Sequence, residues 1–298
     1  MAWYRSITLS RYSVTLIQKT EAGTIIHTGD FKIDHTPIDG YPTDLHRLAH
    51  YGEEGVLLLT SDSTNSHSPG FTKTEKSVGP TFERIFSTAK GRVIMSTFSS
   101  NIHRVSQAIE KGLKFNRKIC VIGRSMEKNL ELAMGLGYIK FPKDQFIDAH
   151  EVNKYNDDEV LIVTTGSQGE SMSALYRMAI HEHRHIKIKP TDQIILSAKA
   201  IPGNEGSVSG IINHLLKAGA KVAYQDYPDI HVSGHAAQEE QKLMLRLVKP
   251  KFFMPVHGEY NHALKHGQTG VDCGVLERNL YIMSDGEQIE VTPKYLKK

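Results

Sequence analysis

Short apolar runs alternate with amphipathic stretches along most of the chain. The runs are rich in Val and Ile and show little strict apolar–polar alternation, which is typical of strands buried on both faces of a parallel sheet. The intervening stretches have helical spacing of apolar positions. The pattern predicts strands at residues 24–27, 56–60, 92–96, 118–122, 160–164, 193–197, 221–225 and 252–256, and helices at 81–88, 102–113, 126–135, 171–181, 207–217 and 236–248.

The order of these elements predicts an α/β fold. Strands that alternate with helices form layered sheets joined by right-handed crossovers. Asn101 and Ser125 stand where N-cap residues would stand, and Gly91 and Gly219 follow helices as C-terminal glycines do. No repeat or low-complexity segment interrupts the pattern.

Composition narrows the class of protein. The 298 residues are 39% hydrophobic and 23% charged, which is an ordinary globular mixture. The net charge of +3 is compatible with a polyanionic partner without being evidence for one. Two cysteines argue against a disulfide framework and predict a reducing, cytoplasmic setting. Neither a membrane span nor the apolar core of a signal peptide is recognisable.

Polar residues gather after several predicted strands, where ligands bind in open α/β sheets. Asp30 follows the strand at 24–27, and His257 follows the strand at 252–256. Asp30 can be a turn cap or a ligand for a divalent cation. His257 can be a strand-end histidine bonded to backbone or a metal ligand. The residues alone leave both pairs of alternatives open.

The segment HVSGH, residues 231–235, is the most unusual local feature. Ser233 and Gly234 offer backbone amides to an anion at the start of the predicted helix at 236–248. His235 can donate a proton to a phosphate or to a leaving group, and the alternative is a plain polar cap. Asp62 can cap a turn or orient an imidazole. We predict a hydrogen bond between His235 and Asp62.

Two further loops, TFSSNIHR and TTGSQGE, join a strand to a helix through hydroxyl and glycine residues. Each can cradle a phosphate, although neither has the lysine pattern of a Walker loop. The run HEHRH, residues 181–185, resembles a metal cluster. We interpret this run as a solvated basic helix end, because histidine and lysine at a helix C-terminus suit the helix dipole.

Six motifs in order resemble the ribonuclease J family of the metallo-β-lactamase superfamily, whose members carry an inserted β-CASP domain. The motifs are HTGDFKID, LLLTSDSTNS, TFSSNIHRV, VTTGSQGE, HVSGHA and PVHGEY. The resemblance implies a partial αββα metallo-β-lactamase-like domain with a Rossmann-like insert. It places the first segment at 1–78, the β-CASP domain at 79–228, the return segment at 229–293 and a tail at 294–298.

The resemblance also implies residue roles. Asp30 would bridge two metal ions, and His257 would be a ligand of one of them. His235 and Asp62 would be the catalytic pair near the scissile phosphate. The substrate-binding residues would be His231, Val232, Ser233, Gly234, His235, Ser99, Ser100 and Ser167. The expected metal is zinc in a two-metal site, with manganese or magnesium as alternatives.

The implied activity is that of a metal-dependent phosphodiesterase, a 5′-to-3′ exonuclease and endonuclease in rRNA processing and mRNA decay. The expected partners are 5′-monophosphorylated or single-stranded RNA, further copies in a homodimer or homotetramer, and RNA-degradation machinery, without a membrane. A non-catalytic RNA-binding or assembly subunit is the main alternative. A hydrolase of small thioesters or lactams on the same fold is a third.

The sequence departs from the family pattern in ways that bear on activity. The His-x-His-x-Asp-His string, which supplies most metal ligands, does not occur in these residues. The family's early His-Ser corresponds to Leu9-Ser10, so that residues 1–14 look altered or foreign. We therefore expect a chain truncated at both ends, which binds zinc weakly and cleaves RNA poorly or not at all.

Overall fold

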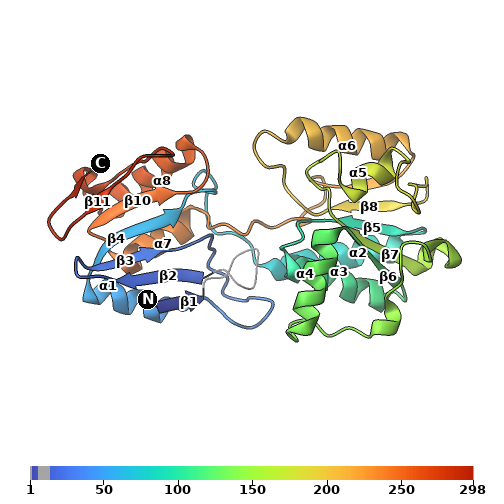
Figure 1. Cartoon of the computed structure of the whole chain (residues 1–298), viewed down its shortest axis with the longest axis horizontal. Coiled ribbons are helices and arrows are strands. Elements are labelled where there is room, and N and C mark those ends of the chain that lie inside the picture. Colours follow the sequence, from blue (N-terminus) through green and yellow to red (C-terminus); the bar gives the residue numbers. More distant parts are fainter. Residues whose placement is uncertain (1, 6–13, 298) are drawn as a thin grey trace. The chain divides into compact units, whose positions relative to one another are not determined.

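The computed structural model describes residues 2–5 and 14–297, and the chain forms two compact units (Figure 1). Unit 1 combines the residues up to Thr74 with those from Ser233 onward, and unit 2 is Glu75–Val232. Unit 2 thus begins at Glu75 rather than at 79 and ends at Val232 rather than at 228. The Leu9-Ser10 pair lies outside the described residues, as does most of the segment expected to be foreign.

Unit 1 is built on a five-stranded sheet with the order β1-β2-β3-β4-β10. The pairings of β1 with β2 and of β2 with β3 are antiparallel, whereas β3, β4 and β10 run parallel. Figure 1 shows β10, from late in the chain, beside the early strand β4. The strands are β1 (Ala2–Arg5), β2 (Val14–Lys19), β3 (Thr24–His27), β4 (Val56–Asp62) and β10 (Phe252–Val256).

Three helices pack against this sheet: α1 (Leu45–Glu54), α7 (Gln238–Val248) and α8 (Tyr260–Asp272). Their shared core joins Leu48 and Met244 to Ile26, Leu59 and Phe253 of the strands. A separate cluster holds Leu296 against residues of β4 and β10. The sequence pattern did not predict β1, β2, α1 or α8.

Unit 2 contains a second five-stranded sheet, entirely parallel, with the order β6-β7-β5-β8-β9. Along the strand β7, which is paired on both sides, Leu161 and Val163 enter one core while Val160 and Ile162 enter the other. Burial on both faces explains why these strands lack polar alternation. The strands are β5 (Val93–Ser96), β6 (Lys118–Ile122), β7 (Val160–Thr164), β8 (Gln193–Leu196) and β9 (Lys221–Ala223).

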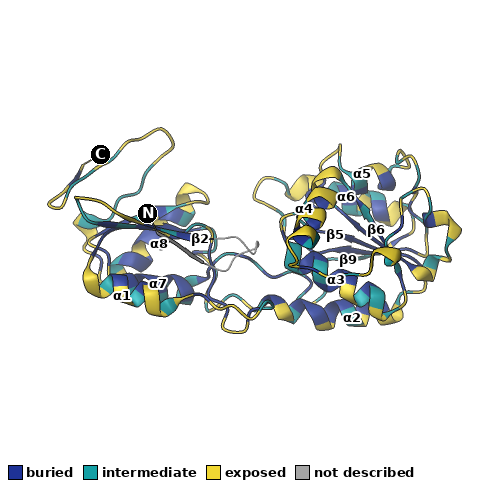
Figure 2. Cartoon of the chain, turned by 60° about the horizontal axis from the view of Figure 1, so that its bottom comes forward, coloured by how far each residue is buried: buried dark blue, intermediate teal, exposed yellow. Residues whose placement is uncertain are grey.

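Helices cover both faces of the second sheet, as the two separate cores require. The helices α2 (Val78–Thr88), α3 (Ile102–Lys114) and α4 (Arg124–Gly135) contribute to one core. The helices α5 (Ala174–Ala179) and α6 (Glu205–Lys217) contribute to the other. Figure 2 shows the strands of this unit in the buried colour and exposed residues on the outer faces of helices. The fold class is therefore the α/β class that the sequence predicts.

Shorter elements complete both units. They are the 3₁₀ helices Glu75–Ser77, Lys143–Gln145, Val152–Lys154, Asp157–Glu159 and Glu277–Asn279, and the paired strands β11 (Glu290–Val291) and β12 (Leu296–Lys297). The strand β12 corrects the expectation that 294–298 is only a tail. Among the described residues, no helix combines the length and the apolar character needed to cross a bilayer.

The predicted helix ends are right in some places and wrong in others. Asn101 caps α3, because its side chain accepts a hydrogen bond from the amide of Arg104 at 3.1 Å. Gly219, at φ +87°, ends α6 in the conformation that favours glycine. Ser125 is not a cap, since α4 already begins at Arg124 after Gly123. Gly91 owes its place to close packing, as a Cβ there would lie 2.4 Å from the carbonyl of Thr191.

Candidate metal and phosphate site

The carboxyl ends of three parallel strands of unit 1 meet at one edge of the sheet. His27 at the end of β3 pairs with Thr60 of β4, and Asp62 at the end of β4 pairs with Val256 of β10. The loops that follow β3 and β10 therefore start side by side. Those loops carry the two residues that the sequence proposes as metal ligands, Asp30 and His257.

His235 and Asp62 form the hydrogen bond that the sequence predicts. Nδ1 of His235 lies 2.7 Å from Oδ2 of Asp62, and the Asp62 side chain is only 1% exposed. The other carboxylate oxygen accepts bonds from the amide and the hydroxyl of Thr64, at 3.0 and 2.7 Å. Asp62 is therefore fixed from two sides and holds the imidazole in one orientation.

This pairing shifts both pKa values despite burial. Burial by itself raises the pKa of Asp62, but the hydrogen bond and charge of His235 outweigh it, so the pKa lies below its usual value. Burial lowers the pKa of His235, but the bond to Asp62 and the charges of Asp62 and Asp30 leave it raised. The pair thus favours its charged forms.

Asp30, His235 and His257 form one cluster of possible metal ligands, with one donor atom of each within 4.8 Å of the others. Nε2 of His257 lies 3.5 Å from Oδ1 of Asp30, and both side chains are about half exposed, at 51% and 50%. The rings of His235 and His257 are 5.5 Å apart. Two imidazoles and a carboxylate are a donor set that zinc accepts, so these residues fit the ion.

The backbone of His257 is in a rare conformation. Its φ is +64°, in the left-handed region that residues with a side chain seldom adopt, and Gly258 follows at φ +78°. Such a conformation costs of order 1 kcal/mol, which surrounding structure must offset. Unusual backbone geometry at this position supports the metal-ligand alternative for His257 over a simple strand-end histidine.

A hydrogen-bond network holds residues Ser233–His235, called here the SGH turn, against the loop after β4. The Asn65 amide group donates to Oγ of Ser233 and to the carbonyl of His235, both at 2.8 Å. The Thr72 hydroxyl donates to the same His235 carbonyl at 2.8 Å. Lys32, only 2% exposed, donates to the carbonyl of Ser233 at 3.3 Å. A buried positive charge therefore lies next to the turn, and no local sequence pattern indicates it.

The helix after this turn begins later than the sequence predicts, and the phosphate site expected at its start stays a prediction. The helix α7 begins at Gln238, three residues after His235, and its first amides are already used. The amide of Ala237 donates to Glu240 at 2.9 Å, and those of Gln238 and Glu239 donate to backbone carbonyls. These three amides therefore are not open to a phosphate. A role for Ser233 and Gly234 would have to come from the turn itself.

Glu240 is a further organiser of unit 1 that the sequence analysis did not single out. Its carboxylate, which is fully buried, accepts from the amides of Ile33 at 2.7 Å, Thr72 at 2.6 Å and Ala237 at 2.9 Å. One side chain thus ties the segment after Asp30 and the segment at Thr72 to the start of α7. The sequence signal was the glutamate at the third position of a helix, as in a capping box.

His231 and Val232 belong to unit 2, where both contact Arg104 of α3. This arginine is fully buried and donates to both carboxylate oxygens of Glu75, at 2.8 and 2.7 Å. It also donates to the carbonyl of Val232 at 2.9 Å and to Nδ1 of His231 at 2.6 Å. A guanidinium can only donate, so Nδ1 of His231 must be the unprotonated nitrogen and Nε2 carries the hydrogen.

The hydroxyl residues of the other two loops meet at the carboxyl ends of β5 and β7 in unit 2. A pocket of about 250 Å³ is lined by Ser99, Ser125, Ser167 and Ser173 with other residues of these loops. Gly166 stands at φ +111° inside this pocket, and a Cβ there would lie 2.3 Å from Oγ of Ser173. Ser99 and Ser167 therefore share one pocket, whereas Ser100 does not line it.

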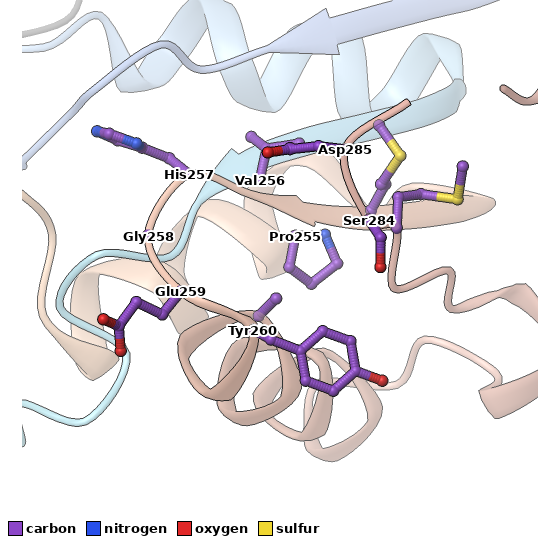
Figure 3. Close-up of a pocket in the computed structure, with 11 residues that line it drawn as sticks. Pro255, Val256, His257, Gly258, Glu259, Tyr260, Ser284 and Asp285 are labelled. Carbon is purple, nitrogen blue, oxygen red and sulfur yellow. The ribbon is translucent and has the colours of Figure 1, made fainter. Parts of the chain in front are cut away.

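A second pocket, of about 470 Å³, lies at the end of β10 in unit 1. Figure 3 shows Pro255, Tyr260 and Ser284 around it, while the His257 ring points to the opposite side of the strand end. The pocket is thus adjacent to the ligand cluster and shares His257 with it.

Two histidines near the site were not among the predicted site residues. Nδ1 of His27 lies 2.6 Å from Oγ1 of Thr60. Burial lowers the pKa of His27, although the charges of Asp30 and Asp62 oppose the shift. His266 is fully buried and lies 3.2 Å from Oγ of Ser63, and burial lowers its pKa to about 3. Only the position of His27 at a strand end was visible in the sequence.

Comparison with known proteins decides the family. Residues 90–215 match the model of the ribonuclease J β-CASP domain. Residues 220–275 match that of the Zn-dependent metallo-hydrolase RNA specificity domain. The chain belongs to the ribonuclease J family. It is 69% identical over 286 residues to ribonuclease J of Helicobacter pylori (strain B128). This alignment covers 96% of the chain and 41% of that relative.

More distant relatives agree with this assignment. Ribonuclease J 1 of Streptococcus pyogenes is 49% identical, over 94% of the chain and 50% of its own length. The chain therefore spans about half or less of these relatives. A crystal structure of a protein of unknown function from Enterococcus faecalis V583 has the same fold, with a TM-score of 0.60 at 13% identity. The alignment covers 95% of the chain and 61% of that protein.

Proposed function

We propose that this chain is part of a metal-dependent ribonuclease, a 5′-to-3′ exonuclease and endonuclease in RNA processing and decay. The observation that carries the proposal is the cluster of Asp30, His235 and His257, with His235 held by the buried Asp62. Metal ligands beside an oriented imidazole are an arrangement that can support metal-assisted phosphodiester hydrolysis. The names of the two relatives, ribonuclease J and ribonuclease J 1, support the same function.

In this proposal Asp30 and His257 hold zinc, and His235 acts on the substrate. Zinc, when bound, supplies Lewis-acid stabilisation of the negative charge that develops on the phosphate oxygens. His235 donates a proton to the leaving oxygen from Nε2, because Nδ1 faces Asp62. The Asp62 carboxylate keeps the ring in that orientation and stabilises its protonated form.

Several features of the two units support a polyanionic substrate. The Lys32 ammonium lies behind the SGH turn in unit 1 and favours a phosphate near Ser233 and Gly234. In unit 2, Arg104 leaves His231 with a hydrogen on Nε2, which suits donation to a phosphate oxygen. The hydroxyl pocket with Ser99 and Ser167 is a second candidate for phosphate binding, and Ser100 stands beside it in sequence. Single-stranded RNA with a 5′-monophosphate is the substrate that we propose.

Each of the two units corresponds, in this proposal, to one domain of the family. We assign the metallo-β-lactamase-like part to unit 1 and the β-CASP insert to unit 2, because the β-CASP match at 90–215 falls inside unit 2. A homodimer or homotetramer, RNA-degradation machinery and a cytoplasmic location stay predictions.

The chain by itself should be a poor enzyme. Catalytic zinc sites use three protein ligands, and two-metal sites use more. Only Asp30 and His257, with His235 beside them, are gathered at this cluster among the described residues. We therefore propose weak zinc binding and slow cleavage. The same shortage of ligands is what favours the alternative, a non-catalytic RNA-binding subunit.

The test compares zinc binding and RNA cleavage in the same preparations. The 298-residue chain, in excess over 5′-monophosphorylated single-stranded RNA, is incubated with zinc or manganese and, separately, with a chelator. We expect slow cleavage that the chelator removes. Asp30→Ala and His257→Ala should weaken zinc binding more than ~10-fold and abolish cleavage. His235→Ala should abolish cleavage.

The matched control is His50→Ala, which changes an exposed histidine on α1 that pairs with Glu54. This variant should retain both zinc binding and cleavage. RNA that is bound equally well with metal and with chelator, and that stays intact, would replace the enzyme assignment by the RNA-binding alternative. Cleavage that survives Asp30→Ala would show that other ligands hold the metal.

A further inference from the structure

The histidine run at 181–185 has a structural neighbour that its sequence context does not reveal. The turn Asp148–Glu151 of unit 2 brings Asp148, His150 and Glu151 together, with one donor atom of each within 4.8 Å of the others. The ring of His185 lies 6.3 Å from that of His150, with an interplanar angle of 62°. An imidazole from a segment more than 30 residues away therefore lies beside the histidine of this group.

The two segments are anchored in the same hydrophobic core, which fixes their donors relative to one another. Ile147 precedes Asp148, Val152 follows Glu151, and Ile186 follows His185, and all three are buried in one cluster. In addition, the Asn153 side chain donates to the carbonyl of His185 at 3.4 Å. The candidate ligands therefore lie next to buried residues that hold their backbone in place. Less conformational entropy is then lost on ion binding than for ligands on a flexible loop.

Existing hydrogen bonds decide which histidine of the run is available. Nδ1 of His183 accepts from the amide of Ile186 at 3.2 Å, so its hydrogen is on Nε2 and the neutral ring has no lone pair left for a metal. Within the described part of the chain no such bond is seen for the ring of His185, which instead packs edge-on against His150. Glu151 already balances a positive charge, because Lys154 lies 3.0 Å from its Oε1. A divalent cation can take the place of this exposed lysine.

We propose that Asp148, His150, Glu151 and His185 form a binding site for a divalent transition-metal ion of the zinc class, separate from the cluster in unit 1. Nitrogen and oxygen donors in equal number suit zinc, nickel or cobalt, whereas calcium and magnesium prefer oxygen alone. Two carboxylates offset the charge of the ion. Bound metal ties the 148–151 turn to the segment before Ile186 and stabilises unit 2. The proposal does not depend on the ribonuclease assignment.

The test uses the full chain with Asp30→Ala and His257→Ala, which remove the ligands of unit 1. Titration with Zn²⁺ should show one ion per chain, and Co²⁺ should give the visible absorption of a nitrogen- and oxygen-coordinated ion. Adding His150→Gln or His185→Gln should weaken binding more than ~10-fold, since even indirect partners of a metal change affinity by that amount. Metal should raise the thermal unfolding temperature only while both histidines are present.

The matched control is His181→Gln, in the same histidine run but outside the donor group. It should leave zinc affinity unchanged. The substituted side chains are at least partly exposed, and unfolding of the metal-free variants at an unchanged temperature verifies their fold. Absence of zinc binding to the background variant would overturn the proposal. Equal affinity after His150→Gln or His185→Gln, or an equal loss after His181→Gln, would overturn it too.

Discussion

Nδ1 of His235 lies 2.7 Å from Oδ2 of Asp62, although 173 residues separate the two in sequence. The whole of unit 2 is inserted between them along the chain. The contact arises because Asn65, in the loop after β4, donates to Oγ of Ser233 and to the carbonyl of His235, which holds residues 233–235 beside the end of β4. Two polar residues that are far apart in the sequence thus form an oriented acid–base pair.

Replacing Asp62 by Asn should lower the pKa of His235. Burial lowers that pKa, and the hydrogen bond and charge of Asp62 are what raise it. Without the carboxylate, the burial effect should dominate. The measurement is the pH titration of the His235 ring signals by NMR in the metal-free chain. Asp39→Asn, which changes an exposed carboxylate that accepts from the amide of Tyr41, is the control. An unchanged titration in Asp62→Asn would mean that the pair does not exist in solution.

Glu240→Ala should destabilise unit 1 by about 3 kcal/mol or more. Three amides, those of Ile33, Thr72 and Ala237, would lose their acceptor, and each buried unpaired donor costs about 1–3 kcal/mol. Urea unfolding measures the change. The neighbouring Glu239→Ala removes an exposed glutamate that pairs with Lys242, and it should cost no more than about 1 kcal/mol. Similar losses in both variants would contradict the role that we give to Glu240.

Gly52→Ala should destabilise unit 1 because α1 and α7 approach closely there. A Cβ on Gly52 would lie 1.9 Å from the carbonyl oxygen of Leu247, so the helices must separate. Overpacking of this kind costs about 1–3 kcal/mol. Gly210→Ala, in α6 with nothing within 4 Å of its added Cβ, should instead stabilise by about 0.5–1 kcal/mol. Thermal unfolding of the two variants should therefore shift in opposite directions, and a shift in one direction for both would refute the packing argument.

His266 should make unit 1 sensitive to acid. Burial holds its folded pKa at about 3, below the 6.5 of the unfolded chain, so the unfolded state binds the proton first. The stability that this group contributes is complete above pH 6.5 and is lost as the pH falls toward 3. His266→Gln should remove about 1.4 kcal/mol per pH unit from the slope of unfolding free energy between pH 6 and 4. Urea unfolding at several pH values measures it, with His214→Gln as the control. An equal slope in wild type and His266→Gln would exclude a buried neutral ring.

Much of the fold could be predicted from local pattern. The strands of unit 2 were recognisable because both faces are buried, which leaves continuous Val and Ile runs such as residues 160–164. The strand β2 was missed because it mixes the buried Ile17 with the exposed Gln18 and is too short to give a clear period. The helix α8 was missed because glycines and histidines dilute its apolar stripe.

The sequence by itself determined the candidates for the site, which are Asp30, Asp62, His235 and His257. It did so because residue type and position after a buried strand are local properties. Only the tertiary structure decided what these residues contact. Parallel pairing of β3, β4 and β10 brought Asp30, Asp62 and His257 to one edge. Asn65 holds His235 beside them, Glu240 took the amide of Ala237 before α7, and the ring of His150 came to lie against that of His185. Such contacts depend on the register of distant strands and on shared cores, which no local pattern encodes.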